Sequence, residues 1–299
     1  MWKNPALNRW GLFWLVAGSI SIAMLIAMAR TGLSTASGVS SMIQLSVRCA
    51  VPWLFLAFAA SALQAVFPSR FSRWLLTNRK YIGLIYAAAM AWQGFFILWL
   101  LIVHTEHYVN EVYVMRDAIE GAIGYTFLLA MTITSFPFAR RRMRAGHWRL
   151  LHLSGIYFLW AYAFTVYWWA LFYYGNPIFL DYLYYVMGLG AWGLRVMAWG
   201  KRSQRRLADR SSSENNLPWL LFGIVFVALG LIVASSGMLW GPLAQRVLYG
   251  YTLTRIPELY LPYWPFEPFI ALAFLALGLV LMSRSQGITR RHVAGESRA

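Results

Sequence analysis

The chain has 299 residues, of which 60% are hydrophobic and only 12% are charged, and its formal net charge is +16. This composition excludes a soluble globular domain and is typical of a protein with several membrane spans. A single cysteine excludes an internal disulfide and a thiolate iron–sulfur centre.

Apolar runs of about the length that crosses a bilayer recur along the whole sequence. In chain order they cover residues 10–29, 41–67, 81–103, 118–138, 150–173, 178–200, 217–240 and 266–283. Arg48 and Pro52 interrupt the second run and predict a kink there. The sequence therefore predicts an all-α integral membrane protein with about eight transmembrane helices.

The positive charges are distributed unevenly between the segments that connect these runs. If the connections alternate between two sides, the connections and adjoining run ends of one side hold 21 of the 26 Lys and Arg, and those of the other hold seven of the ten acidic residues. This pattern indicates the positive-inside rule and argues against a nucleic-acid partner. It predicts a multi-pass protein of the cell inner (plasma) membrane with both termini cytoplasmic.

A change in composition follows the sixth run. Residues 201–217 form a polar, Ser-rich connector that ends near Pro218, which predicts a domain boundary. We expect a six-span core over residues 1–200, the cytoplasmic linker 201–217, a two-span extension over 218–284, and a cytoplasmic tail over 285–299. The extension contains a long external loop, residues 241–269, which is rich in Tyr and Pro.

Four of the five histidines flank or enter the third and fifth runs. His104 and His107 lie at the outer end of the third run, and His147 and His152 lie at the inner end of the fifth. Such histidines are either polar groups near the lipid headgroups or ligands of a buried cofactor. Motifs for metal-dependent hydrolysis, for a Ser/His/Asp triad and for nucleotide binding do not occur in the sequence.

Three stretches carry a resemblance to a known family. They are MTITSFPFARRRMRAGHWRLLHLSGIYFLW, NRKYIGLIYAAAMAWQ and SVRCAVPWLFLAFAASALQAVF. They resemble helices 2 to 5 of the ferric reductase-like transmembrane domain superfamily, which includes bacterial haem-binding sulfoxide reductase subunits, ferric reductases and the NADPH oxidase membrane core. The resemblance covers roughly residues 40–200, and the two spans of the extension lie outside it.

The resemblance implies b-type haem held between the third and fifth helices by paired histidines. His152 matches the inner ligand of the fifth helix, but its partner position on the third helix holds Gln93. His107 matches the outer ligand of the third helix, but its partner position on the fifth helix holds Thr165. Each implied pair therefore keeps one histidine and loses the other, so the chain would be a divergent member of the family.

Three functional interpretations follow. In the first, one haem remains, either five-coordinate or with an unconventional second ligand such as His104, Met90 or Met131, and the protein transfers electrons across the membrane to an external partner. In the second, the fold persists without haem, and the vacated groove binds a lipid, a quinone or a pigment, or is filled by the abundant Trp and Phe side chains. In the third, the protein is an accessory subunit that associates with membrane lipid and with other membrane or periplasmic subunits. The sequence contains no flavin or nicotinamide domain, so it predicts at most an oxidoreductase component.

Overall fold

The computed structural model describes residues 4–172, 176–207, 217–237, 239 and 270–282. These residues are almost entirely helical, and none of them lies in a strand. In chain order the helices are η1 (Pro5–Leu7), α1 (Arg9–Thr31), α2 (Ala36–Val66), α3 (Arg70–Val103), α4 (Thr105–His107), the π-helix η2 (Tyr108–Val112), α5 (Met115–Thr134), α6 (Pro137–Arg140), α7 (Ala145–Phe172), α8 (Phe179–Leu207), α9 (Leu217–Ser235) and the helix Ile270–Met282.

Five of these helices, α1, α2, α3, α7 and α9, are long and apolar enough to cross a membrane. This confirms the prediction of an all-α chain with several apolar helices, while the count of eight spans stays a prediction. A helix does occupy each of the three remaining predicted runs. However, these three helices are not among the five. The first two turns of α5 contain three charged residues, α8 contains Asp181 and Arg195, and the helix Ile270–Met282 is short.

Two segments that were expected to connect the predicted spans are helical. The basic stretch between the second and third predicted runs forms the first turns of α3, which begins at Arg70. Ser69 and Ser72 explain this start, because each side-chain hydroxyl accepts a hydrogen bond from the other residue's backbone N–H, at 3.0 Å and 2.9 Å.

The second such segment is the beginning of the predicted linker 201–217, because α8 continues to Leu207. The rest of that linker up to residue 216 lies outside the described residues, as do the external loop 241–269 and the tail 285–299.

The chain forms two compact units whose boundaries fall inside α2, α3 and α7. Unit 1 comprises residues 1–60 and 73–163, and unit 2 comprises residues 61–72 and 164–299. The division into a core over residues 1–200 and an extension over 218–284 stays a prediction.

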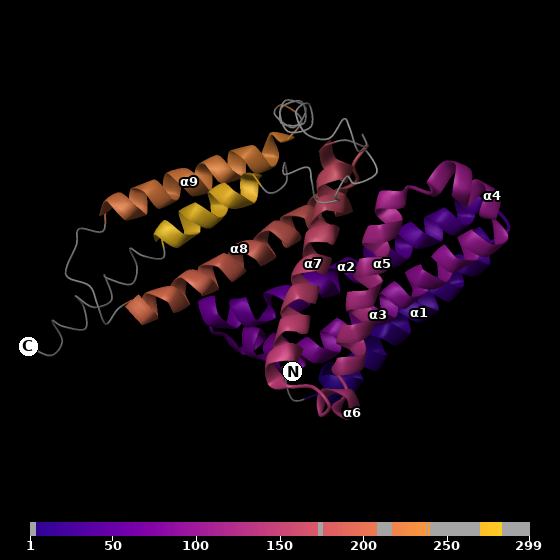
Figure 1. Cartoon of the computed structure of the whole chain (residues 1–299), viewed down its shortest axis with the longest axis horizontal. Helices are drawn as coiled ribbons and strands as arrows, with labels where there is room; N and C mark the ends of the chain where they lie inside the picture. Colours follow the sequence, from indigo (N-terminus) through magenta and orange to yellow (C-terminus); the bar gives the residue numbers. More distant parts are fainter. Residues whose placement is uncertain (1–3, 173–175, 208–216, 238, 240–269, 283–299) are drawn as a thin grey trace, which may run out of the picture. The chain divides into compact units, whose positions relative to one another are not determined.

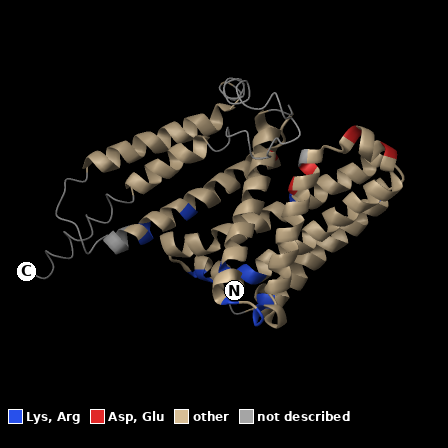
Figure 2. Cartoon of the chain, in the orientation of Figure 1, with Lys and Arg blue, Asp and Glu red and all other residues tan. Residues whose placement is uncertain are grey.

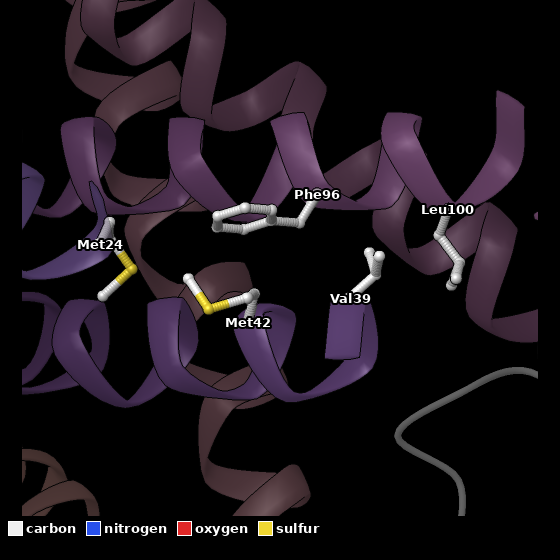
Figure 3. Packing of buried hydrophobic residues seen from close by; sticks show 5 residues of the cluster. All are labelled: Met24, Val39, Met42, Phe96 and Leu100. Atoms are coloured by element: carbon white, nitrogen blue, oxygen red, sulfur yellow. The ribbon is translucent and has the colours of Figure 1, made fainter. Parts of the chain in front are cut away.

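The core of unit 1 includes a contact between its first three long helices. Figure 3 shows the buried side chains of this cluster, which come from α1 (Met24), α2 (Val39 and Met42) and α3 (Phe96 and Leu100). None of them is more than 1% exposed. Unbranched methionines beside a phenylalanine fill the irregular space between the helices, which fixes α1 and α2 against the C-terminal half of α3.

The opposite end of α1 is attached to α3 by hydrogen bonds. The fully buried Asn78 accepts a 2.7 Å bond from the backbone N–H of Arg9 and donates a 3.2 Å bond to the side chain of Asn8. The indole N–H of Trp74 donates to the carbonyl of Leu7 at 2.9 Å. The bond from Arg9 satisfies a backbone N–H at the start of α1 that has no partner within the helix, and the other two attach the residues just before α1 to α3.

Charges are separated along unit 1 (Figure 2). Lys and Arg gather at the end that contains α6 and the start of α1, whereas Asp and Glu lie around α4 and the beginning of α5. Arg30, in the last turn of α1, is an exception at the acidic end. This segregation matches the alternation of charge in the sequence.

Unit 2 contains a close helix pair and a tyrosine contact. An added Cβ at Gly223 or Gly230 of α9 would lie within 3 Å of backbone atoms of Met282 or Leu275, so α9 and the helix Ile270–Met282 approach each other closely. The hydroxyl of Tyr185 on α8 donates a 3.0 Å hydrogen bond to the carbonyl of Ala234, near the end of α9. Close approach at small residues is typical of helices packed in a membrane.

Candidate functional site

The four positions that the family resemblance assigns to haem ligands are distributed over α3, α4 and α7. Gln93 lies in the second half of α3, and His152 lies in the third turn of α7. His107 is the last residue of α4, and Thr165 lies near the end of α7. His152, Gln93 and His107 belong to unit 1, whereas Thr165 belongs to unit 2.

Gln93 forms a contact between α3 and α5. Its side-chain oxygen accepts a 2.8 Å hydrogen bond from the hydroxyl of Tyr125, which also lies 3.1 Å from the carbonyl oxygen of Met90. Gly94 lies beside this contact, and a Cβ there would be at ordinary van der Waals distance, 3.4 Å, from the Tyr125 ring. The amide at position 93 therefore joins two helices through a tyrosine that the sequence analysis did not identify.

His152 forms a second contact with α5, at the C-terminal end of that helix. Its Nε2 lies 3.0 Å from the hydroxyl oxygen of Thr134, the last residue of α5. The ring of Trp148 lies beside the imidazole, with 4.3 Å between the ring centroids. The indole N–H of Trp148 donates to the carbonyl of Thr134 at 3.1 Å. Together these two side chains of α7 hold the end of α5, where backbone carbonyls have no partner within the helix.

These two contacts are far apart along α5. Tyr125 and Thr134 are nine residues apart, which corresponds to about 13 Å along a helix axis at 1.5 Å per residue. Gln93 and His152 are bonded to these two positions, so they contact different parts of α5. In this structure both members of the implied inner pair serve as separate contacts with α5.

His107 is exposed and lies beyond the end of α3. That helix ends at Val103, and the next residue, His104, has φ −119° and ψ 43°, outside the α-helical region. Gln93 and His107 therefore do not share the face of one continuous helix. His104, a suggested second ligand, has its Nε2 3.1 Å from the carbonyl oxygen of Leu33.

Thr165 is 5% exposed, and its hydroxyl has no hydrogen-bond partner among the described residues. Because it belongs to unit 2, its position relative to His107 is not defined. Met131, another suggested ligand, packs its sulfur against the backbone of α7 at Gly155.

These observations test whether the residues fit b-type haem. A haem with two axial ligands needs donors on opposite sides of one iron. Here Gln93 offers an amide that is bonded to a tyrosine, and Thr165 offers a hydroxyl. His107 has an imidazole, but it is exposed and lies past a helix break. By side-chain chemistry each implied pair therefore offers one imidazole rather than two, and of these imidazoles only that of His152 is half-buried.

Comparisons with known proteins add no assignment. No family model, curated protein or solved structure matches this chain. The ferric reductase-like resemblance therefore depends on the sequence motifs alone.

A shallow apolar groove lies elsewhere in unit 1, between α1 and α3. It has a volume of about 480 Å³ and is lined by Leu25, Met28, Ala88, Ala91, Trp92 and Phe95. None of the predicted ligand positions lines it. The predicted groove for a lipid, quinone or pigment was expected between the third and fifth spans, so this groove is a different feature.

Proposed function

We propose that this chain is a haem-free accessory subunit of a larger membrane complex. The observation that carries the proposal is the use of Gln93 and His152 as helix-to-helix contacts at two separate places on α5. A side chain that holds two helices together contributes to stability without any cofactor. On this proposal, the core keeps a ferric reductase-like arrangement and has lost the chemistry of the family.

The apolar helices supply the surfaces for such a role. In α1 and α9 only 17% of the most apolar 18-residue window is buried within the structure, so most of these side chains contact either lipid or another subunit. We further infer that the protein lies in the inner (plasma) membrane with the basic end of unit 1 at the cytoplasmic side. Its partners would be membrane lipid and other membrane or periplasmic subunits.

Electron transfer through a single b-type haem is the second candidate function, and the surroundings of His152 favour it. The imidazole is half-buried, and Arg79 and Arg140 lie close enough to interact with it electrostatically. These guanidinium groups could pair with anionic haem propionates, and a bound haem would supply one-electron transfer. His152 would first have to leave Thr134, and the electrons would pass to an external partner.

One spectroscopic experiment separates these two functions. The full chain is expressed with ample haem, purified, and tested for a Soret band and a pyridine haemochrome signal. We expect neither signal, and we expect co-purification from native membranes within a larger assembly. A red, redox-active protein that is isolated alone would contradict the accessory role and support the second candidate.

The Gln93→His variant makes the same test sharper. If a haem lies between α3 and α7, the new imidazole restores the family pair, and the spectrum changes to that of low-spin, six-coordinate iron. On the accessory proposal, the variant shows no new absorbance, because position 93 faces Tyr125. His152→Ala is the matched control, since it removes the sole half-buried imidazole of the implied set and should abolish any haem signal.

A further inference from the structure

The basic end of unit 1 forms a surface whose exposed cations have no role in either proposed function. We call it the basic collar, and it consists of Arg9, Arg73, Arg79, Lys80, Arg140, Arg141, Arg142, Arg144 and Arg149. Arg141, Arg142, Arg144 and Arg149 are exposed, in the turn between α6 and α7 and in the first turns of α7. Figure 2 shows this end of the unit in blue, close to α6.

The described residues of unit 1 provide no acidic side chain at the collar. Every Asp and Glu described in this unit lies between residues 106 and 120, around α4 and the start of α5. So many cations with no nearby anion repel one another and create a strong positive potential. The collar therefore attracts anions from outside unit 1.

Aromatic rings lie between and beneath these cations. The Lys80 ammonium is 5.4 Å from the centre of the Phe136 ring and 5.7 Å from that of Tyr81. The Arg140 guanidinium lies 4.8 Å from the ring centre of Trp148. Such contacts hold a cation in place without neutralising its charge.

Two further rings next to these are exposed, which extends the collar with apolar surface. Trp10 stacks on Phe136 with 6.3 Å between the ring centroids and is 42% exposed. Phe138, in α6, also stacks on Phe136 and is 61% exposed. Exposed Trp and Phe beside Arg and Lys, at the end of helices that can cross a membrane, match the chemistry of the boundary between headgroups and acyl chains.

We propose that the basic collar binds the headgroups of anionic phospholipids. The phosphates would contact Arg141, Arg142 and Arg144, while the exposed rings of Trp10 and Phe138 would insert beside the first carbons of the acyl chains. A free phosphate ion would use the cations alone and would gain nothing from the rings. This arrangement therefore favours a lipid over a soluble anion, and it does not depend on whether haem is bound.

Native mass spectrometry of the full-length, detergent-purified protein tests this proposal. The probes are phosphatidylglycerol and phosphatidylcholine, which differ in net charge but share acyl chains. We expect the wild-type protein to bind phosphatidylglycerol more tightly. Each basic residue near a lipid surface contributes an affinity factor of about five, so the triple variant R141Q/R142Q/R144Q should lose on the order of 100-fold.

Two single variants provide the matched comparison. R142Q removes one exposed charge from the collar, and we expect about a five-fold loss of affinity for phosphatidylglycerol. R30Q removes one exposed charge at the opposite end of unit 1 and should leave the affinity unchanged. All of these side chains are exposed, so the thermal stability of the variants in detergent should match that of the wild type.

Three results would overturn the proposal. The first is equal affinity for the two lipids, and the second is an unchanged affinity in the triple variant. The third is full displacement of phosphatidylglycerol by millimolar inorganic phosphate, because this would assign the collar to a soluble anion. Equal losses in R142Q and R30Q would show that only net charge matters, which also contradicts a local site.

Discussion

At the scale of single residues, buried polar side chains of unit 1 hold separate segments together. Asn78 is 0% exposed and makes three hydrogen bonds through one amide group: to its own helix at Trp74, to the side chain of Asn8 and to the backbone of Arg9. Arg9 has a φ of 52°, in the left-handed region that most residues avoid. The hydrogen bond from its N–H to Asn78 helps to hold that conformation.

Replacing Asn78 with Ala should destabilise the protein by about 1–3 kcal/mol, because the Arg9 N–H and the Asn8 side chain would lose their buried partner. Denaturant-induced unfolding of the purified protein in detergent measures this change. Thr77→Ala is the control, since the hydroxyl of Thr77 is exposed and bonds only to its own helix, at Arg73. Similar effects of the two substitutions would contradict the role of Asn78.

The Gln93–Tyr125 hydrogen bond can be measured by a double-mutant cycle with Gln93→Leu and Tyr125→Phe. Hydrogen bonds between membrane helices contribute about 0.6 kcal/mol on average. We therefore expect the two substitutions to be coupled by roughly that free energy of unfolding. Additive effects would show that the 2.8 Å contact does not stabilise the protein.

At the scale of helices, unit 2 depends on glycines that let two backbones approach. Gly223 and Gly230 of α9 lie against the helix Ile270–Met282, and Gly278 of that helix lies in turn against the backbone of α9. The lipid tails around a membrane protein are as apolar as leucine, so burial alone does not drive such pairing. Close packing and van der Waals contact do, and they require small residues at the crossing.

The Gly230→Ala variant tests this packing. Its new Cβ would lie 2.9 Å from the backbone nitrogen of Leu275, which cannot move without shifting a helix. We expect a loss of about 1–3 kcal/mol in the free energy of unfolding, as for other overpacked sites. Gly190→Ala in α8 is the control: its Cβ would meet no described atom within 4 Å, and alanine favours the helix by up to about 1 kcal/mol. A neutral Gly230→Ala would contradict the close approach.

At the scale of the whole molecule, the separation of charge in unit 1 predicts its orientation in the membrane. The basic collar lies at one end and the acidic residues 106–120 lie at the other. Positively charged segments are retained on the cytoplasmic side during insertion. The same rule predicts that both termini are cytoplasmic.

Single cysteines test this orientation in a Cys49→Ser background, because Cys49 is the sole native thiol. Glu111→Cys should react with a membrane-impermeant maleimide in intact cells. Arg142→Cys should react only after the membrane is permeabilised. The reverse labelling pattern would contradict the predicted topology. Both positions are exposed, so a failure to react in permeabilised cells would reveal a covering partner.

The sequence by itself determined the class of protein. Runs of about twenty apolar residues can form stable structure in a bilayer only as helices, because every backbone N–H and C=O must find a partner within its own segment. The charged residues between the runs likewise indicated the two ends of unit 1, which the structure separates. Both properties depend on local composition, so they can be predicted without knowing which helices are neighbours.

Only the tertiary structure decided what the individual polar residues do. Gln93, His152 and Asn78 are polar groups on apolar helices, and the sequence cannot tell whether such a group binds a cofactor, a tyrosine or a helix end. The answer depends on which side chain of another helix lies within 3 Å, such as Tyr125 or Thr134. Those partners are 32 and 18 residues away in the chain, and helix packing rather than local pattern brings them together.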